Sequence, residues 1–269
     1  MIEFDFLLKL VAEASEAILE VYRTDFTVEH KEDHSPVTVA DRRSHELICQ
    51  GLRAAYPDIP AVSEEGMAIP HHVRQSWRRF WLVDPLDGTK EFVKKNGEFA
   101  VNIALVEGDT PVLGVIAIPT TGKAFVGRRD EGCWEIMGDR RRRVKVAEAP
   151  AGRPVRVTKS RSHPSPNMGS LLALLPSQEL ITMGSAIKFC KMAAGEADFY
   201  PRLGSTWEWD TAAGQALVAA AGGVMVDSHG NPLRYNKPTL MNGPYFVASS
   251  LNWLEKTGIL ERARSLDLG

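Results

Sequence analysis

Two carboxylates stand three residues apart in the segment Asp84-Pro85-Leu86-Asp87-Gly88-Thr89. Pro85 favours an extended backbone at Asp84, and Gly88 allows a sharp turn, so both carboxylates can face one point. Two anions this close repel each other, and a shared proton or a bound cation relieves the repulsion. Because the available ligands are oxygen atoms, a cation held here would be a hard metal such as Mg²⁺.

The end of this segment has the features of an anion site. Gly88 and Thr89 lead into a predicted helix at 90–95, and free backbone N–H groups at a helix start bind anions such as phosphate. Cations held by acids beside such a turn indicate metal-assisted phosphoryl chemistry, in which a water is activated and the leaving oxygen is stabilised.

Further acids stand at the ends of other predicted elements. Glu64 and Glu65 follow a short apolar run that predicts a strand, and Asp41 and Asp210 lie near the starts of predicted helices. For Asp41 and Asp210 the alternative to a functional role is helix capping, which contributes about 0.3–1 kcal/mol.

Alternating helices and strands would position these side chains. Apolar residues at helical spacing predict an amphipathic helix at 4–22, and Thr38 is a suitable N-cap for a helix at 39–55. The dipeptide Gly108-Asp109 between two apolar runs predicts a hairpin. The remaining predicted helices are at 168–175, 185–194, 210–221 and 251–264, and the predicted strands are at 61–63, 80–83, 99–106, 112–118, 123–127, 134–137, 155–158, 179–182 and 224–227.

A strand-rich middle followed by alternating strands and helices indicates a layered α/β sandwich. The Pro- and Gly-containing stretch at 149–154 is the candidate linker. It would separate an N-terminal α+β subdomain at 1–150, which carries most of the acids, from a C-terminal α/β subdomain at 151–269.

Two other features have structural interpretations. The run Arg140 to Arg143 follows Gly138-Asp139, and we expect an exposed turn there instead of a nucleic-acid patch. The apolar pairs Trp77/Phe80 and Trp207/Trp209 are expected to lie in the core.

Composition excludes several classes of protein. The chain has 269 residues, 44% of them hydrophobic, and a formal charge of −2, which excludes a disordered chain and gives no general attraction to nucleic acid or anionic membranes. Three separated cysteines do not indicate a disulfide framework. The N-terminus lacks the pattern of a signal peptide, and the longest apolar run is too short to cross a bilayer. We expect a cytoplasmic protein without an integral membrane segment, either free or peripheral at the inner membrane face.

The motifs together resemble a known family, the lithium-sensitive, magnesium-dependent phosphomonoesterases of the inositol monophosphatase superfamily. Within it, they are most similar to the 3'(2'),5'-bisphosphate nucleotidases. The resemblance extends over nearly the whole chain. It is specific, because the motifs occur together and in the family's order along the chain. It rests on Asp33 to Asp41, Ser63-Glu64-Glu65, Trp81 to Phe92, Gly97-Glu98-Phe99, Val101 to Leu105 and Trp209 to Gly214.

The resemblance implies a five-layer αβαβα sandwich of the inositol monophosphatase and sugar phosphatase type, with two or three Mg²⁺ ions per site. Glu64, Asp84 and the Leu86 carbonyl would bind one ion, and Asp84, Asp87 and Asp210 a second. Asp41 with Thr89 would orient and deprotonate the attacking water, and the Gly88 and Thr89 N–H groups would hold the phosphate. Glu65 is expected to point away, because neighbours on a strand face opposite sides.

Two further segments suggest the substrate. Ser160-Arg161-Ser162-His163 and Gly184 to Cys190 are similar to the nucleotide-holding segments of the bisphosphate nucleotidases. Ser185 and Lys188 lie three apart at a predicted helix start and suit a second phosphate. His163 could stack on adenine, although an ordinary loop histidine is an equal alternative, and Arg202 could reach a phosphate. The implied substrate is adenosine 3',5'-bisphosphate, a by-product of sulfate activation in sulfur metabolism, with its sulfated analogue as a second substrate.

Other functions remain as alternatives at this point. An inositol monophosphatase or an inositol polyphosphate 1-phosphatase would share the metal site, and a nucleotide-binding sensor would bind without turnover. A serine acyl-enzyme would fit the S-x-x-K match at Ser185 and the K-T-G match at Lys256, but the S-D-N triplet is missing. The sequence leaves the oligomeric state open between monomer and homodimer.

Overall fold

The computed structural model describes residues 2–31, 36–162, 165 and 167–266. Its largest element is a seven-stranded sheet with the order β3-β4-β5-β6-β7-β8-β9. Strands β3 and β4 are parallel, and every other neighbouring pair is antiparallel. The strands are β3 (Ala61–Ser63), β4 (Arg79–Asp87), β5 (Ala100–Glu107), β6 (Thr110–Ile118), β7 (Lys123–Arg128), β8 (Gly132–Met137) and β9 (Arg140–Val144).

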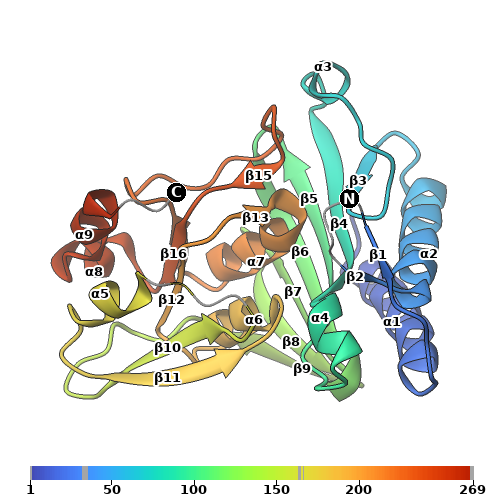
Figure 1. Ribbon diagram of the computed structural model, residues 1–269. Coiled ribbons are helices and arrows are strands. Elements are labelled where there is room, and N and C mark those ends of the chain that lie inside the picture. Colours follow the sequence, from blue (N-terminus) through green and yellow to red (C-terminus); the bar gives the residue numbers. More distant parts are fainter. Residues whose placement is uncertain (1, 32–35, 163–164, 166, 267–269) are drawn as a thin grey trace.

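Two long helices, α1 (Phe4–Tyr22) and α2 (Val39–Ala55), cover one face of this sheet (Figure 1). Both have the bounds that the apolar spacing predicts. Thr38 caps α2 as predicted, because its hydroxyl accepts a hydrogen bond from the Ala40 N–H. Alternate residues of β4 pack on opposite faces: Trp81 and Val83 face α1 and α2, whereas Phe80 and Leu82 face the interior of the molecule.

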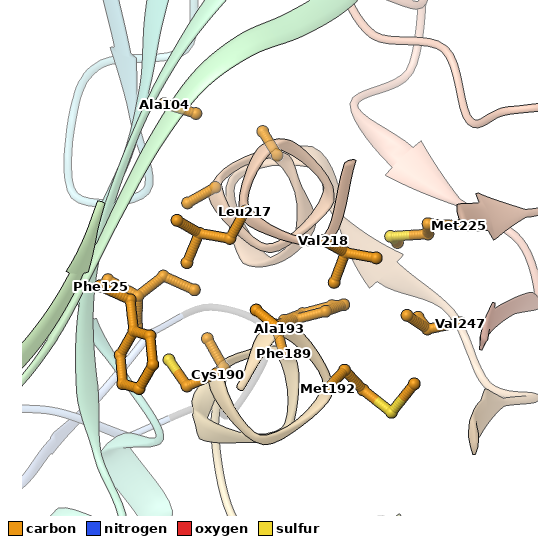
Figure 2. Close-up of a cluster of buried hydrophobic side chains, with 14 of the residues drawn as sticks. Ala104, Phe125, Phe189, Cys190, Met192, Ala193, Leu217, Val218, Met225 and Val247 are labelled. Atoms are coloured by element: carbon orange, nitrogen blue, oxygen red, sulfur yellow. The ribbon is translucent and has the colours of Figure 1, made fainter. Parts of the chain in front are cut away.

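Helices α6 (Ile187–Ala193) and α7 (Glu208–Ala220) form the middle layer, between the large sheet and a second sheet. Figure 2 shows their side chains meeting Ala104 and Phe125 on one side and Met225 and Val247 on the other. The layers approach closely because glycines stand at the contacts. A Cβ at Gly114 of β6 would overlap the Ala213 backbone of α7, and one at Gly214 would overlap the Phe189 ring of α6.

The second sheet has five strands, in the order β11-β10-β12-β16-β14. Its outer face is covered by α5 (Met168–Leu172), α8 (Leu251–Lys256) and α9 (Ile259–Ser265), so the molecule has five layers, αβαβα, with three hydrophobic cores between them (Figure 1). The expected fold class is confirmed. The strands are β10 (Val155–Ser160), β11 (Gln178–Met183), β12 (Phe199–Arg202), β14 (Val224–Val226) and β16 (Tyr245–Ala248).

Short elements complete the chain, and they were not predicted from the sequence, apart from α4. Two small two-stranded sheets pair β1 with β2 and β13 with β15. Among the described residues, no helix is both long and apolar enough to cross a bilayer. The short elements are β1 (Glu29–His30), β2 (Pro36–Val37), α3 (His71–Arg74), α4 (Thr89–Val93), the 3₁₀ turn Pro119–Thr121, β13 (Thr206–Trp207) and β15 (Met241–Asn242).

Two sequence predictions of local structure were wrong, and two strands were missed. Arg140 to Arg143 do not form a turn: they are the edge strand β9, whose exposed charges discourage pairing with another chain. The predicted helix at 251–264 is two helices, because Gly258 adopts a φ of 71° between α8 and α9. Strands β12 and β16 were missed, because each has only four residues and so short a run gives no distinct period.

Candidate functional site

The predicted acidic turn is the end of strand β4. Asp84 lies in the strand and is 1% exposed, and its Oδ1 accepts a hydrogen bond of 3.1 Å from the Leu86 N–H. The pairing of β4 with β5 is irregular here, because Asp84 pairs with Asn102 and Asp87 with Ala100, which marks a β-bulge between the two carboxylates. Gly88 then adopts a φ of 92°, and a Cβ there would approach Glu98 O and Ser185 Cβ to 3.0 Å. A residue with a side chain would therefore be strained at position 88.

Four carboxylates from separate parts of the chain line one pocket of about 220 Å³. Glu64 follows β3, Asp84 and Asp87 end β4, and Asp210 lies in the first turn of α7. The Leu86, Gly88 and Thr89 positions line the same pocket. The structure thus brings together the acids that the sequence analysis assigned to the metal site.

The acids of the pocket hold protons more tightly than free carboxylic acids do. Burial raises the pKa of Asp84 well above its usual value, and the charges of Glu64, Asp87 and Asp210 raise it further. Burial also raises the pKa of Asp210 strongly and that of Asp87 to about 6, where the Lys188 charge and the Ala186 N–H hydrogen bond oppose the rise. Such repulsion between buried anions is relieved by positive charge.

Each of these carboxylates has a partner in the protein. Asp87 accepts a hydrogen bond from the Ala186 N–H, Asp210 accepts one of 2.8 Å from the Trp207 N–H, and Glu64 accepts one of 2.8 Å from Lys31 Nζ. In the part of the chain that the structure describes, no three acidic, histidine or cysteine side chains are already grouped as ligands of one ion. The donor set nevertheless fits a divalent cation such as Mg²⁺, because it combines several carboxylates and a backbone carbonyl in one pocket.

Asp41 and Thr89 meet beside this pocket, as the sequence analysis expected. Thr89 Oγ1 lies 3.1 Å from Asp41 Oδ1 and 3.2 Å from Leu86 O, so its proton can be donated to either acceptor. Asp41 Oδ2 accepts hydrogen bonds from both the N–H and the hydroxyl of Thr38. Asp41 therefore also forms the capping box of α2, and the two roles are not exclusive. Burial outweighs the Thr38 hydrogen bonds and raises the pKa of Asp41 to about 6.

The strand argument for the orientation of Glu65 does not hold, although Glu65, unlike Glu64, is not among the residues that line the pocket. Strand β3 ends at Ser63, so Glu64 and Glu65 lie in a turn and strand alternation does not apply to them. Both carboxylates contact Lys31 Nζ. Lys31 was missed in the sequence, since an isolated lysine near a two-residue strand carries no motif.

Most of the residues assigned to substrate binding line the pocket. They are Ser160, Ser185, Lys188 and Arg202. His163 lies outside the described residues. Lys188 is 4% exposed, and its Nζ donates hydrogen bonds to the carbonyls of Ser185 and Met183. Burial lowers its pKa to about 8, so it remains mostly protonated at pH 7.

The pocket wall also contains aromatic residues that were not predicted to be functional. Tyr200 and Tyr245 line the pocket, with their hydroxyl oxygens 3.3 Å apart. Trp207, which was expected in the core, is 38% exposed and also lines the pocket. The core prediction for Trp207 was therefore wrong. Trp209, its stacking partner, is partly buried and packs against the central core as expected.

Contacts between the two halves of the chain frame the pocket. Glu98 accepts hydrogen bonds from Arg161 and from the Gly184 N–H, and Ser162 contacts the buried Glu91. The Gly184 turn leads to Ser185, which has a φ of 46°. These contacts fix the α6 end of the pocket against the β4–α4 turn.

A layered αβαβα sandwich with an acidic pocket of this composition is typical of metal-dependent phosphatases. Residues 3–268 match the family model described as the inositol monophosphatase family, and the chain belongs to that family. Enzymes of this family are metal-dependent and typically use Mg²⁺.

Individual relatives are similar over almost their whole length. The chain is 43% identical over 247 residues to the 3'(2'),5'-bisphosphate nucleotidase CysQ of Escherichia coli O6:H1, covering 91% of this chain and 98% of the relative. The crystal structure of CysQ from Bacteroides thetaiotaomicron is 37% identical, with a TM-score of 0.80, and the match covers 91% and 97% of the two chains. An inositol monophosphatase from Zymomonas mobilis is 25% identical with a TM-score of 0.76, covering 96% and 97%.

Proposed function

We propose that this protein is a 3'(2'),5'-bisphosphate nucleotidase that hydrolyses adenosine 3',5'-bisphosphate to AMP and phosphate. The observation that carries this proposal is the pocket, which combines carboxylates suited to metal ions with basic and aromatic side chains suited to a nucleotide. The similarity to the CysQ proteins over 91% of the chain supports the same activity.

Glu64, Asp84 and the Leu86 carbonyl would hold one Mg²⁺, and Asp84, Asp87 and Asp210 a second. Bound Mg²⁺ supplies positive charge for the phosphate and Lewis acidity for the attacking water. Asp84 contributes to both sets, which agrees with its central place among the interacting charges of the pocket. A third Mg²⁺ ion would bind beside Asp41, at an additional and weaker site.

Asp41 and Thr89 would prepare the nucleophile. Thr89 Oγ1 can donate its proton to Asp41 Oδ1, which leaves its lone pairs free to accept a hydrogen bond from a water molecule. Asp41 is ionised above pH 6 and can then take the Thr89 proton while the Thr89 hydroxyl takes one from that water. The backbone N–H groups of Gly88 and Thr89 would hold the phosphate that is removed.

The second phosphate of the substrate would lie near Lys188, on the side of the pocket formed by the start of α6. Lys188 is buried there beside Ser185, and Arg202 lines the same region. A buried lysine that faces a cavity is stabilised by an anionic ligand, because the anion replaces the hydration that the lysine lacks. His163 remains a proposed adenine contact.

Phosphate release from a panel of esters tests this proposal. The panel contains adenosine 3',5'-bisphosphate, its sulfated analogue, inositol 1-phosphate, inositol 1,4-bisphosphate and fructose 1,6-bisphosphate, each assayed with Mg²⁺ and with EDTA. We expect the highest kcat/KM for adenosine 3',5'-bisphosphate and no turnover with EDTA. Preference for an inositol phosphate would identify an inositol phosphatase, and binding without turnover would identify a nucleotide sensor.

A further inference from the structure

Trp207 is an aromatic residue that the metal site does not use. It lies in β13, three residues before Asp210, and lines the pocket while 38% of it remains exposed. Ligand pockets are lined mainly by apolar and aromatic side chains, so a partly exposed tryptophan in this wall offers a surface on which a ligand can pack.

The backbone of Trp207 is held at several points. Its N–H donates a hydrogen bond of 2.8 Å to Asp210, and its carbonyl accepts one of 3.2 Å from Asn242 Nδ2. Strand β13 also pairs with β15, in which Met241 is the partner of Trp207. The position of this residue is therefore fixed relative to a carboxylate of the acidic pocket.

The indole ring of Trp207 is also oriented. It stacks on Trp209, with ring centroids 5.2 Å apart and an interplanar angle of 14°. Trp209 in turn packs against the central core. Stacking covers one face of the Trp207 ring, so the exposed area belongs to the remainder of the side chain. Because the Trp207 ring is already oriented, little conformational entropy is lost when a second flat ring packs on it.

We propose that Trp207 binds the nucleobase of the substrate by stacking and so selects nucleotides over sugar and inositol phosphates. This inference rests on the proposed nucleotidase function. A nucleobase has a flat π-face that can pack on indole, whereas an inositol or sugar ring has none. Because every base has such a face, Trp207 selects for the presence of a base more strongly than for its identity.

Calorimetric binding of AMP and of ribose 5-phosphate tests the inference. Ribose 5-phosphate carries the sugar and phosphate of AMP without the base. We expect Trp207→Ala to weaken AMP binding by about 5-fold to 150-fold, the range for loss of one base–aromatic stack, and to leave ribose 5-phosphate binding unchanged. Trp207→Phe keeps an aromatic ring and should retain most of the AMP affinity. Leu180→Ala, which removes an exposed apolar side chain on β11 outside the pocket lining, is the matched control and should change neither Kd.

Specific outcomes overturn the inference. Unchanged AMP binding in Trp207→Ala, or equal weakening of both ligands, would show that Trp207 does not hold the base. Wild-type protein that binds AMP no more tightly than ribose 5-phosphate would overturn the inference as well, because the base would then add nothing to binding. Circular dichroism melting of both variants separates a binding defect from misfolding. Failure of the proposed function would be seen differently: the wild-type protein would bind AMP but release no phosphate from adenosine 3',5'-bisphosphate.

Discussion

Asp41 shows how one buried side chain can serve both folding and chemistry. One carboxylate oxygen completes the capping box of α2, and the other meets Thr89 beside the acidic pocket. An asparagine can keep part of the cap but cannot accept the Thr89 proton.

We therefore expect Asp41→Asn to lower kcat by about 10²-fold to 10⁴-fold, the usual contribution of a general base, while the KM for the nucleotide changes little. Steady-state phosphate release checks this expectation. Asp58→Asn, which changes an exposed aspartate, is the matched control. Normal turnover in Asp41→Asn would remove Asp41 from the mechanism.

The pKa of Asp41 gives a second prediction at the same scale. Because burial raises this pKa to about 6, the carboxylate becomes protonated as the pH falls below 6 and can no longer accept a proton. With Mg²⁺ saturating, we expect kcat to be level above about pH 7 and to fall tenfold per pH unit well below pH 6. A profile that stays level down to pH 4.5 would contradict the role given to Asp41.

The acids of the site were predictable from sequence, because they belong to contiguous motifs at element ends. The turn Asp84 to Thr89 carries its own backbone signals, Pro85 and Gly88. The contact of Lys31 with Glu64 and the place of Trp207 in the pocket wall were not predictable, since both depend on tertiary contacts between segments far apart in the chain. The strand argument for Glu65 did not apply, because the end of β3 could not be located to within one residue.

At the scale of elements, helix α7 links the site to the sheet. It carries Asp210 in its first turn and packs on β6 at Gly114, where a Cβ would overlap the Ala213 backbone. The position of Asp210 therefore depends on a contact in which there is no room for a side chain.

We expect Gly114→Ala to lower the unfolding free energy by about 1–3 kcal/mol, the usual cost of overpacking, and to reduce activity by displacing α7. Gly169→Ala is the matched control, because a Cβ at Gly169 of α5 has open space and its φ is not in the left-handed region. That control should be neutral or stabilising by about 0.4–1 kcal/mol. Thermal melting and phosphate release measure both effects, and equal stability of the two variants would refute the packing argument.

Elements with a strong period were predicted well. The bounds of α1 and α2 follow directly from their apolar stripes and the Thr38 cap. Strand β9 was read as a turn, since four consecutive arginines lack the alternation of a half-buried strand. The break between α8 and α9 was missed because one glycine within a helical pattern is often tolerated.

For the molecule as a whole, the acidic pocket links stability to pH and to metal. Asp41 and Asp87 both have a pKa of about 6 in the folded state, above the usual aspartate value near 3.8. Between pH 3.8 and pH 6 the folded state binds more protons than the unfolded state. The two protonated aspartates therefore stabilise the folded state most in acid, and this stabilisation is lost as the pH rises through 6.

In EDTA we therefore expect the Tm to fall as the pH is raised from 5 to 7.5, and Mg²⁺ to restore it at pH 7.5 more than at pH 5. Cations bind the ionised carboxylates of the folded state, which stabilises that state by mass action. Differential scanning fluorimetry at both pH values provides the measurement. The same Tm with and without Mg²⁺ at pH 7.5 would contradict a metal site formed by these acids.

The five-layer arrangement was predictable only through the resemblance of the motifs to a family. The alternation of helices and strands indicated a layered α/β sandwich, but it did not fix the order of strands in either sheet. Strand order depends on pairings such as β12 with β16, which join segments that have no sequence signal in common.

The middle layer also has a consequence for synthesis on the ribosome. The large sheet is complete in sequence at Val144, yet α7, which covers its inner face, begins only at Glu208. During translation Phe80, Leu82 and Val106 would thus be exposed to water until the later helix emerges from the exit tunnel. The nascent protein is expected to need a chaperone, or a delay in folding, over that interval.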